Sequence, residues 1–127
     1  MRQEHALEHA LAGTGKVIDF SGKWVNELES AMTVVQTNGV LSGTYESKKS
    51  STGATAIGDL VGYVDGDLIS FTVHWRAFQA ITAWVGQLDS KAKKQTIHTL
   101  WQLTKQVVPG EEWASINAGS DSFTRLL

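Results

Sequence analysis

The stretch AMTVVQTNGVLSGTYES, residues 31–47, decides the fold class of this chain. It contains two runs of alternating residues joined by Asn38-Gly39, a strong hairpin signal because both residues tolerate positive φ. We therefore predict antiparallel strands over 31–37 and 40–47. Alternation places Leu41, Gly43, Tyr45 and Ser47 on one face of the second strand, which we expect to face inward.

Similar runs recur along the rest of the chain, separated by short turn signals. They predict six further strands, over 18–28, 57–64, 67–76, 80–89, 95–104 and 117–126. Short connections favour an up-and-down meander, so we expect an all-β, eight-stranded antiparallel β-barrel. A barrel of this size can hold one small ligand, and its closure removes exposed sheet edges.

Residues 1–16 do not follow the strand pattern and are expected to form a tail or short helix outside the barrel domain, residues 17–127. They contain His5-Ala6-Leu7-Glu8-His9, which matches a zinc-binding pattern of inverted zincins. The match lies at the terminus, with no following helix to supply a third ligand. We therefore predict no metal site.

Composition excludes several classes of function. The 127 residues carry a net charge of only −2, so the chain has no field that would gather nucleic acid. The chain has no cysteine and no apolar run long enough to span a membrane. Neither nucleic acid nor a membrane is expected as a partner, and no apolar core of signal-peptide length is visible.

The inner faces combine aromatic side chains with polar groups. In GKWVNELES, residues 22–30, alternation directs Trp24, Asn26, Leu28 and Ser30 inward and the glutamates outward. Buried polar groups need partners, and a packed core rarely carries many of them. Aromatic walls with a few placed polar groups are typical of a ligand site. The inward polar residues are Asn26, Ser30, Tyr45, Ser47, Thr82 and Asp121, and we expect Asn26 and Ser30 to bond a ligand instead of the protein.

The chain resembles the avidin and streptavidin biotin-binding proteins, in particular bacterial avidin-like members. The matching segments occur in order over about residues 20–126: GKWVNELES, GTYES, FTVHW, TAWVGQ, TLWQLT and EEWASINAGSDSFT. The resemblance implies high-affinity, non-covalent binding and sequestration of biotin inside the barrel, one site per subunit. It implies a binding protein with no enzymatic activity, no catalytic residue and no cofactor.

The resemblance also assigns roles to individual residues. Asn26, Ser30 and Tyr45 match the donors to the ureido oxygen of biotin, and Asp121 and Ser47 match the acceptors for its two N–H groups. Thr82 matches the hydroxyl that contacts the thioether sulfur. The apolar walls match Leu28, Trp75, Trp84 and Trp101, and Trp113 matches a tryptophan that reaches in from a neighbouring subunit.

The carboxylate end of the ligand is where the chain departs from the family pattern. Ala80 stands where streptavidin-like members have a serine, and Lys49 where an apolar residue is usual. Ser51 lies near the position from which the family binds the carboxylate. The contacts at that end, and the affinity itself, are left open by the sequence.

The strands over 80–89 and 95–104 are apolar on both faces, which indicates that something covers the outside of the barrel. Together with Trp113 in a polar loop, this predicts a homo-oligomer. We expect a tetramer formed through strands near Ile81, Val85, His98 and Leu100. Secretion or a periplasmic location is implied by the resemblance alone.

Two other functions are compatible with a barrel of this kind. One is a lipocalin-like carrier or a small barrel enzyme that uses Asp121 as a base near Tyr45. No inward histidine or second inward carboxylate is predicted beside them, which counts against an enzyme. The other is a structural barrel with an interaction surface on Ile81, Val85 and Leu100.

Overall fold

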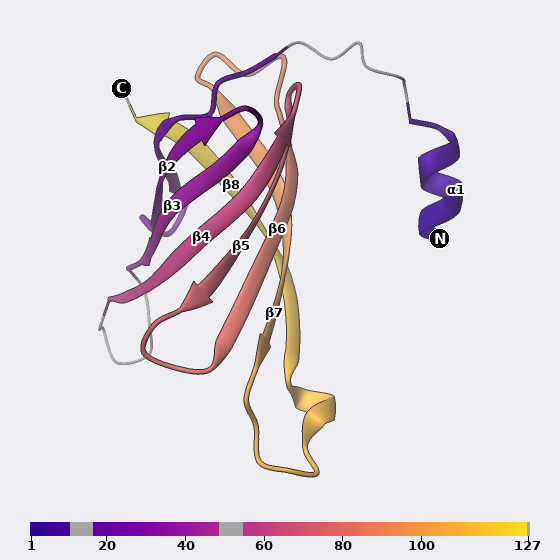
Figure 1. Cartoon of the computed structure of the whole chain (residues 1–127), viewed down its shortest axis with the longest axis vertical. Helices are drawn as coiled ribbons and strands as arrows, with labels where there is room; N and C mark the ends of the chain where they lie inside the picture. Colours follow the sequence, from indigo (N-terminus) through magenta and orange to yellow (C-terminus); the bar gives the residue numbers. More distant parts are fainter. Residues whose placement is uncertain (11–16, 49–54, 127) are drawn as a thin grey trace.

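The computed structural model describes residues 1–10, 17–48 and 55–126. They form a closed antiparallel barrel of eight strands, with one short helix before it (Figure 1). The strands are β1 Gly22–Asn26, β2 Ala31–Thr37, β3 Val40–Ser47, β4 Ala56–Asp65, β5 Leu68–Trp75, β6 Ala80–Leu88, β7 Thr96–Lys105 and β8 Ile116–Leu126. The predicted all-β, up-and-down barrel is confirmed.

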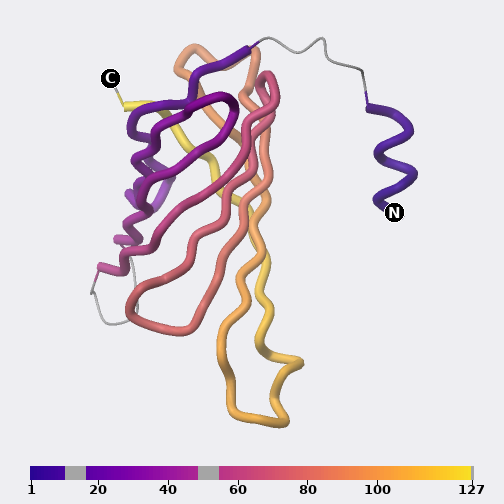
Figure 2. The backbone as a smooth tube through the Cα atoms, in the orientation of Figure 1, coloured from indigo at the N-terminus to yellow at the C-terminus, as the bar shows by residue number. Residues whose placement is uncertain are grey.

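Each strand pairs with the next in sequence, and β1 pairs with β8 to close the barrel. The closing register places Asn26 opposite Phe123 and Trp24 opposite Arg125. The β7–β8 connection projects beyond the ends of the other strands (Figure 2). It contains η1, a 3-10 helix over Glu112–Ala114. This topology brings the first and last strands together, so residues distant in sequence can contribute to one site.

The core lies inside the barrel and follows the predicted alternation. Asn38 and Gly39 adopt positive φ angles of 51° and 77°, as the hairpin prediction requires. Tyr45, Phe71, Trp75, Thr82 and Trp84 are buried on the faces expected to point inward. The buried apolar side chains are Phe20, Trp24, Met32, Val34, Leu41, Tyr45, Leu60, Ile69, Phe71, Val73, Trp75, Ala80, Trp84, Ile97 and Phe123.

The first strand is shorter than predicted. We expected it to run over 18–28, but β1 ends at Asn26 and the chain then turns, with Glu29 at a φ of 66°. The Asn26 side-chain oxygen closes this turn by accepting the N–H groups of Leu28 and Ser30. Leu28 is therefore a turn residue, 49% exposed, and the prediction that it continues the inward face of the strand is wrong.

The N-terminal segment contains α1, Gln3–Glu8, which has no buried residue. His5 and Glu8 lie 4.0 Å apart there, but the described residues contain no cluster of three or more potential metal ligands. Within the same residues, no helix is long and apolar enough to cross a membrane. The division of the chain at residue 16 stays a prediction.

Candidate ligand-binding site

Three predicted polar residues meet near the end of β1. Asn26 is the last residue of β1, Ser30 immediately precedes β2, and Tyr45 lies on β3. All three are buried, and the Asn26 Nδ2 donates a hydrogen bond to the Tyr45 Oη at 3.3 Å. The β2–β3 register and the β1 turn therefore assemble one polar cluster from three separate segments.

Contrary to our expectation, Asn26 and Ser30 have hydrogen-bond partners within the protein. The Asn26 Oδ1 accepts backbone N–H groups from Leu28 at 3.0 Å and Ser30 at 2.9 Å. The Ser30 Oγ accepts the N–H of Lys48 at 3.1 Å. The expectation that these residues bond a ligand instead of the protein is wrong for their acceptor atoms. Within the described residues, no hydrogen bond uses the second Asn26 amide hydrogen or the Ser30 hydroxyl hydrogen, so both groups can still donate.

Tyr45 is held as a donor by its surroundings. Burial raises its pKa well above the usual range, the negative charges of Asp121 and Glu27 add to the effect, and the neighbouring Ser30 hydroxyl opposes it. The phenol is therefore protonated at any physiological pH. The cluster of Asn26, Ser30 and Tyr45 can therefore donate hydrogen bonds to a ligand.

Asp121 supplies the acceptor. It lies half-buried on β8, and the Trp84 Nε1 donates to its Oδ2 at 2.9 Å. The pKa of Asp121 is raised to about 6, mainly by burial, against the hydrogen bond from Trp84; the neighbouring Glu27 adds to the rise, and the Asn26 amide opposes it. Because Trp84 occupies Oδ2, the other carboxylate oxygen is left for a further donor.

Glu27 is a site residue that sequence reasoning missed. Alternation assigned it to the solvent side, and it is exposed, but it lies in the turn after β1 and not on the outer face of the strand. Its carboxylate accepts the backbone N–H of Ser122, the residue after Asp121, at 3.0 Å, and it contributes to the raised pKa of Asp121. No local sequence signal could have found a contact between residues 95 positions apart.

The aromatic residues line the barrel next to this polar end. The Trp84 ring stacks on Phe71 with centroids 4.9 Å apart and on Tyr45 at 4.8 Å. Trp75 donates from its Nε1 to the Thr82 Oγ1 at 3.0 Å, which leaves the Thr82 hydroxyl hydrogen free to donate. Aromatic and polar groups therefore occur together, as expected of a ligand site.

The remaining predicted residues are distributed less tightly. Trp101 and Ser47 are half-buried, on β7 and at the end of β3. Ala80 is buried at the start of β6. Trp113 is 85% exposed in η1, so the single chain does not bring it into a buried site. Ser51 and Lys49 lie outside the described residues.

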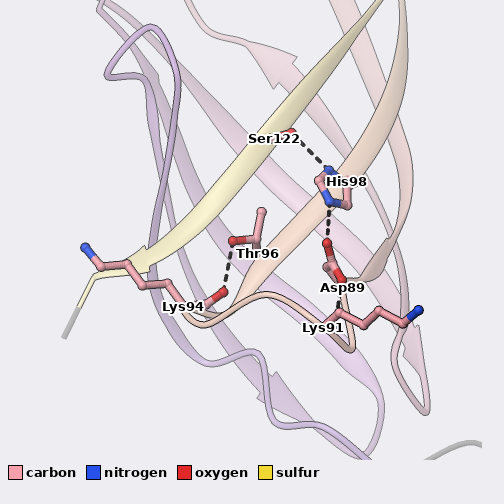
Figure 3. A network of polar contacts seen from close by, with 6 residues as sticks. All are labelled: Asp89, Lys91, Lys94, Thr96, His98 and Ser122. Atoms are coloured by element: carbon pink, nitrogen blue, oxygen red, sulfur yellow. Dashed lines mark hydrogen bonds and ion pairs between the residues drawn. The ribbon is translucent and has the colours of Figure 1, made fainter.

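A serine, a histidine and an aspartate form a chain of hydrogen bonds on the outer face (Figure 3). Ser122 Oγ lies 3.1 Å from His98 Nδ1, and His98 Nε2 lies 2.9 Å from Asp89 Oδ2. These residue types can build a nucleophilic site, but the Ser122 N–H that could stabilise an oxyanion there is bonded to Glu27. The chain of bonds instead connects β8 and β7 to the turn after β6.

Comparison with known proteins agrees with this geometry. A model of the avidin family matches residues 14–126. The chain belongs to the avidin family. Chicken (Gallus gallus) avidin is 30% identical over 119 residues, which cover 84% of this chain and 77% of avidin. Chicken avidin-related protein 4/5 is also 30% identical, with the same coverage. The crystal structure of Xenavidin superposes with a TM-score of 0.76 at 33% identity, covering 87% of this chain and all of Xenavidin.

Family membership confirms the resemblance found in the sequence. The members of this family are non-enzymatic biotin-binding proteins that need no cofactor, and membership therefore counts against the small barrel enzyme. Avidin and avidin-related protein 4/5 are chicken proteins, so the narrower expectation of a bacterial avidin-like member stays a prediction.

The raised pKa of Asp121 predicts a pH-dependent effect of Asp121→Asn on the unliganded protein. A carboxyl whose pKa rises on folding contributes stability below its unfolded pKa of 3.8, and that contribution is lost as pH rises through about 6. Asparagine does not ionise, so the variant avoids this loss of stability at high pH, and its amide oxygen can still accept the hydrogen bond from Trp84. Thermal melting should show that the substitution favours the fold more at pH 8 than at pH 4.

Asp59→Asn is the matched control, because a hydrogen bond from Arg76 lowers the pKa of Asp59. This substitution should act in the opposite direction, costing more stability at pH 8 than at pH 4. If each variant changed the melting temperature by the same amount at pH 4 and at pH 8, the raised pKa of Asp121 in the folded protein would be contradicted.

Proposed function

We propose that this chain binds and sequesters biotin non-covalently and with high affinity inside the barrel, one site per subunit. The observation that carries the proposal is the donor cluster of Asn26, Ser30 and Tyr45 close to the carboxylate of Asp121. A cyclic urea is the complementary group, since it has a carbonyl oxygen that accepts and N–H groups that donate. Biotin contains such a cyclic urea, and membership in the avidin family supports biotin as the ligand.

The donor cluster receives the ureido oxygen. Three donors on one oxygen stabilise the negative charge that the urea places there, and burial strengthens each bond. The Asn26 amide is already fixed by two backbone N–H groups, so it loses little freedom when a ligand binds. Tyr45 remains protonated and so donates throughout the physiological range.

Asp121 accepts one ureido N–H through the oxygen that Trp84 does not use. Ser47 accepts the other N–H. A carboxylate on one side of the urea polarises it toward the donors on the other side. Thr82, oriented by Trp75, directs its hydroxyl hydrogen to the thioether sulfur.

The rings and tail of biotin contact the walls formed by Trp75, Trp84 and Trp101. Burying apolar surface there contributes about 25 cal/mol for each Å² removed from water. Leu28, in the turn after β1, and Ser51, near the carboxylate end, complete the proposed set. With a methyl group at Ala80, that end offers the carboxylate one hydroxyl fewer.

Calorimetric titration tests the proposal directly. We expect one biotin per chain, and we expect Asp121→Ala to weaken binding by about 100-fold or more, because it removes a buried, charged acceptor. Asp59→Ala removes an exposed carboxylate on β4 and should leave the affinity unchanged. Absence of heat with both biotin and desthiobiotin at micromolar protein would reject the proposal.

We further propose that four chains assemble through the outer faces of β6 and β7. Val85 is 64% exposed, Leu100 71% and Ile81 45%, and His98 lies on the same side of β7 as Leu100. Apolar side chains gathered in this way favour an interface. Trp113, 85% exposed in one chain, then reaches the site of a neighbour. Family membership supports a secreted or periplasmic location.

Sedimentation velocity tests the assembly. The protein should sediment as a tetramer, and Leu100→Glu should produce smaller species because it buries a charge at the interface. Val35→Glu is a matched control, since Val35 is 60% exposed on β2, away from β6 and β7. A monomer at tens of micromolar chain, or equal effects of the two substitutions, would contradict the proposal.

A further inference from the structure

One tryptophan of the candidate site lies against a glycine on the neighbouring strand. Trp101 on β7 pairs with Gly119 on β8, and the two strands run side by side (Figure 1). Trp101 shares the inner face of β7 with the buried Thr99, two residues earlier. Gly119 shares the inner face of β8 with Asp121, two residues later. The glycine therefore lies on the same face as the proposed acceptor for the ligand.

The contact leaves no room for a side chain at Gly119. A Cβ placed there would lie 2.5 Å from Cζ2, 2.8 Å from Cε2 and 3.1 Å from Nε1 of Trp101. Carbon atoms in contact are normally about 3.5–4.0 Å apart, so even a methyl group would overlap the indole. All three nearest atoms belong to Trp101. The indole thus fills the space that a side chain on this position of β8 would need.

The other tryptophan in this row of inner positions is held differently. Trp84 on β6 pairs with Trp101 across the two strands. The Trp84 ring stacks on Phe71, which lies on β5, on the far side of β6 from β7. Trp101 instead lies over the β8 backbone at Gly119. The two indoles therefore lean in opposite directions around the barrel.

The backbone conformation does not explain why a glycine stands at this position. Gly119 is not among the residues with a positive φ, so alanine could adopt its conformation. A glycine inside a strand also weakens that strand, because it has no side chain to pack. What glycine provides on this part of β8 is space for the indole of Trp101.

We propose that Gly119 is a specificity-determining residue, which keeps Trp101 against β8 and thereby leaves room in the barrel for the part of the ligand beyond its ureido ring. The inference rests on the proposed function, because it concerns the wall that the rings and tail of biotin contact. In Gly119→Ala, the indole must move away from β8, toward the barrel axis. It then occupies space that the rings and tail require, while the donors at the end of β1 stay in place.

Two ligands separate this wall from the ureido end of the site. Ethyleneurea consists of the ureido ring alone, and desthiobiotin adds a methyl group and the acid tail. In Gly119→Ala, the dissociation constant of desthiobiotin, measured by calorimetry, should rise about tenfold or more, because overpacking of side chains already in contact is costly. The dissociation constant of ethyleneurea, measured by NMR titration, should change by less than about twofold.

Gly86→Ala is the matched control. Gly86 is an inner-face glycine of β6, and its three nearest atoms belong to His98 and Thr99, with the Thr99 Cγ2 2.7 Å from a Cβ placed there. The substitution therefore creates a similar overlap without displacing Trp101. It should lower the melting temperature, but it should change the dissociation constants of both ligands by the same factor.

Trp101→Phe tests the contact itself. Phenylalanine lacks Cζ2, the atom nearest to the added Cβ, so it relieves the overlap. In the wild type this substitution should weaken desthiobiotin, because it removes apolar wall. In Gly119→Ala it should instead restore affinity toward that of Trp101→Phe alone, a non-additive effect that a general loss of stability would not produce. If Gly119→Ala does not fold, the double variant should fold for the same reason.

The outcomes separate this inference from the proposed function. Failure of the wild type to bind either ligand would reject biotin binding. The indole N–H resonance of Trp101, identified by its loss in Trp101→Phe, tests the contact without a ligand, since it should shift in Gly119→Ala and not in Gly86→Ala. Equal weakening of both ligands in Gly119→Ala, additive effects of the two substitutions, or an unshifted indole resonance would overturn the role of Gly119 and leave the function intact.

Discussion

The pairing of β1 with β8 is the interaction on which the candidate site depends. It closes the barrel, and it brings Asn26 and Glu27, near the start of the chain, next to Asp121, near its end. Without this pairing the donors and the acceptor would lie on opposite edges of an open sheet. Closure of the barrel therefore removes the exposed sheet edges and also brings together the residues of the candidate site.

The short length of β1 determines what that chemistry is. The chain turns directly after Asn26, and the amide oxygen of Asn26 closes the turn. The acceptor capacity of Asn26 and Ser30 is thereby directed to backbone N–H groups. Within the described residues, one Asn26 amide hydrogen and the Ser30 hydroxyl hydrogen can still donate to a ligand. Because of these hydrogen bonds within the protein, the polar groups at the end of β1 can act as donors to a ligand, and Asp121 on β8 can act as an acceptor.

Much of this could be read from the sequence, because alternation is a local property. The Asn38-Gly39 hairpin fixed the register of β2 and β3, and with it the inward position of Tyr45. The same period placed Thr82 and Trp84 correctly on β6. The family resemblance added the roles of these residues, which alternation alone cannot supply.

The features that were missed depend on contacts between distant segments. The early end of β1 involves a positive φ at Glu29, and glutamate is not a residue type that predicts a turn of this kind. As a result Leu28 was placed inside the strand. Glu27 is exposed, as alternation predicted, but alternation gave no sign of its bond to Ser122. The bond from Ser122 to Glu27 exists only once the barrel has closed. Trp113 is exposed in one chain and its proposed contact is with a neighbouring chain, so its position within one chain does not define its contacts.

The central claim is that the polar end of this barrel is built for a cyclic urea. A crystal structure of the chain with biotin tests it most directly. The account predicts the ureido oxygen within about 3 Å of the Asn26 Nδ2, the Ser30 Oγ and the Tyr45 Oη, with one ureido N–H on Asp121. Biotin bound outside the barrel, or with its ureido ring turned away from these residues, would contradict it.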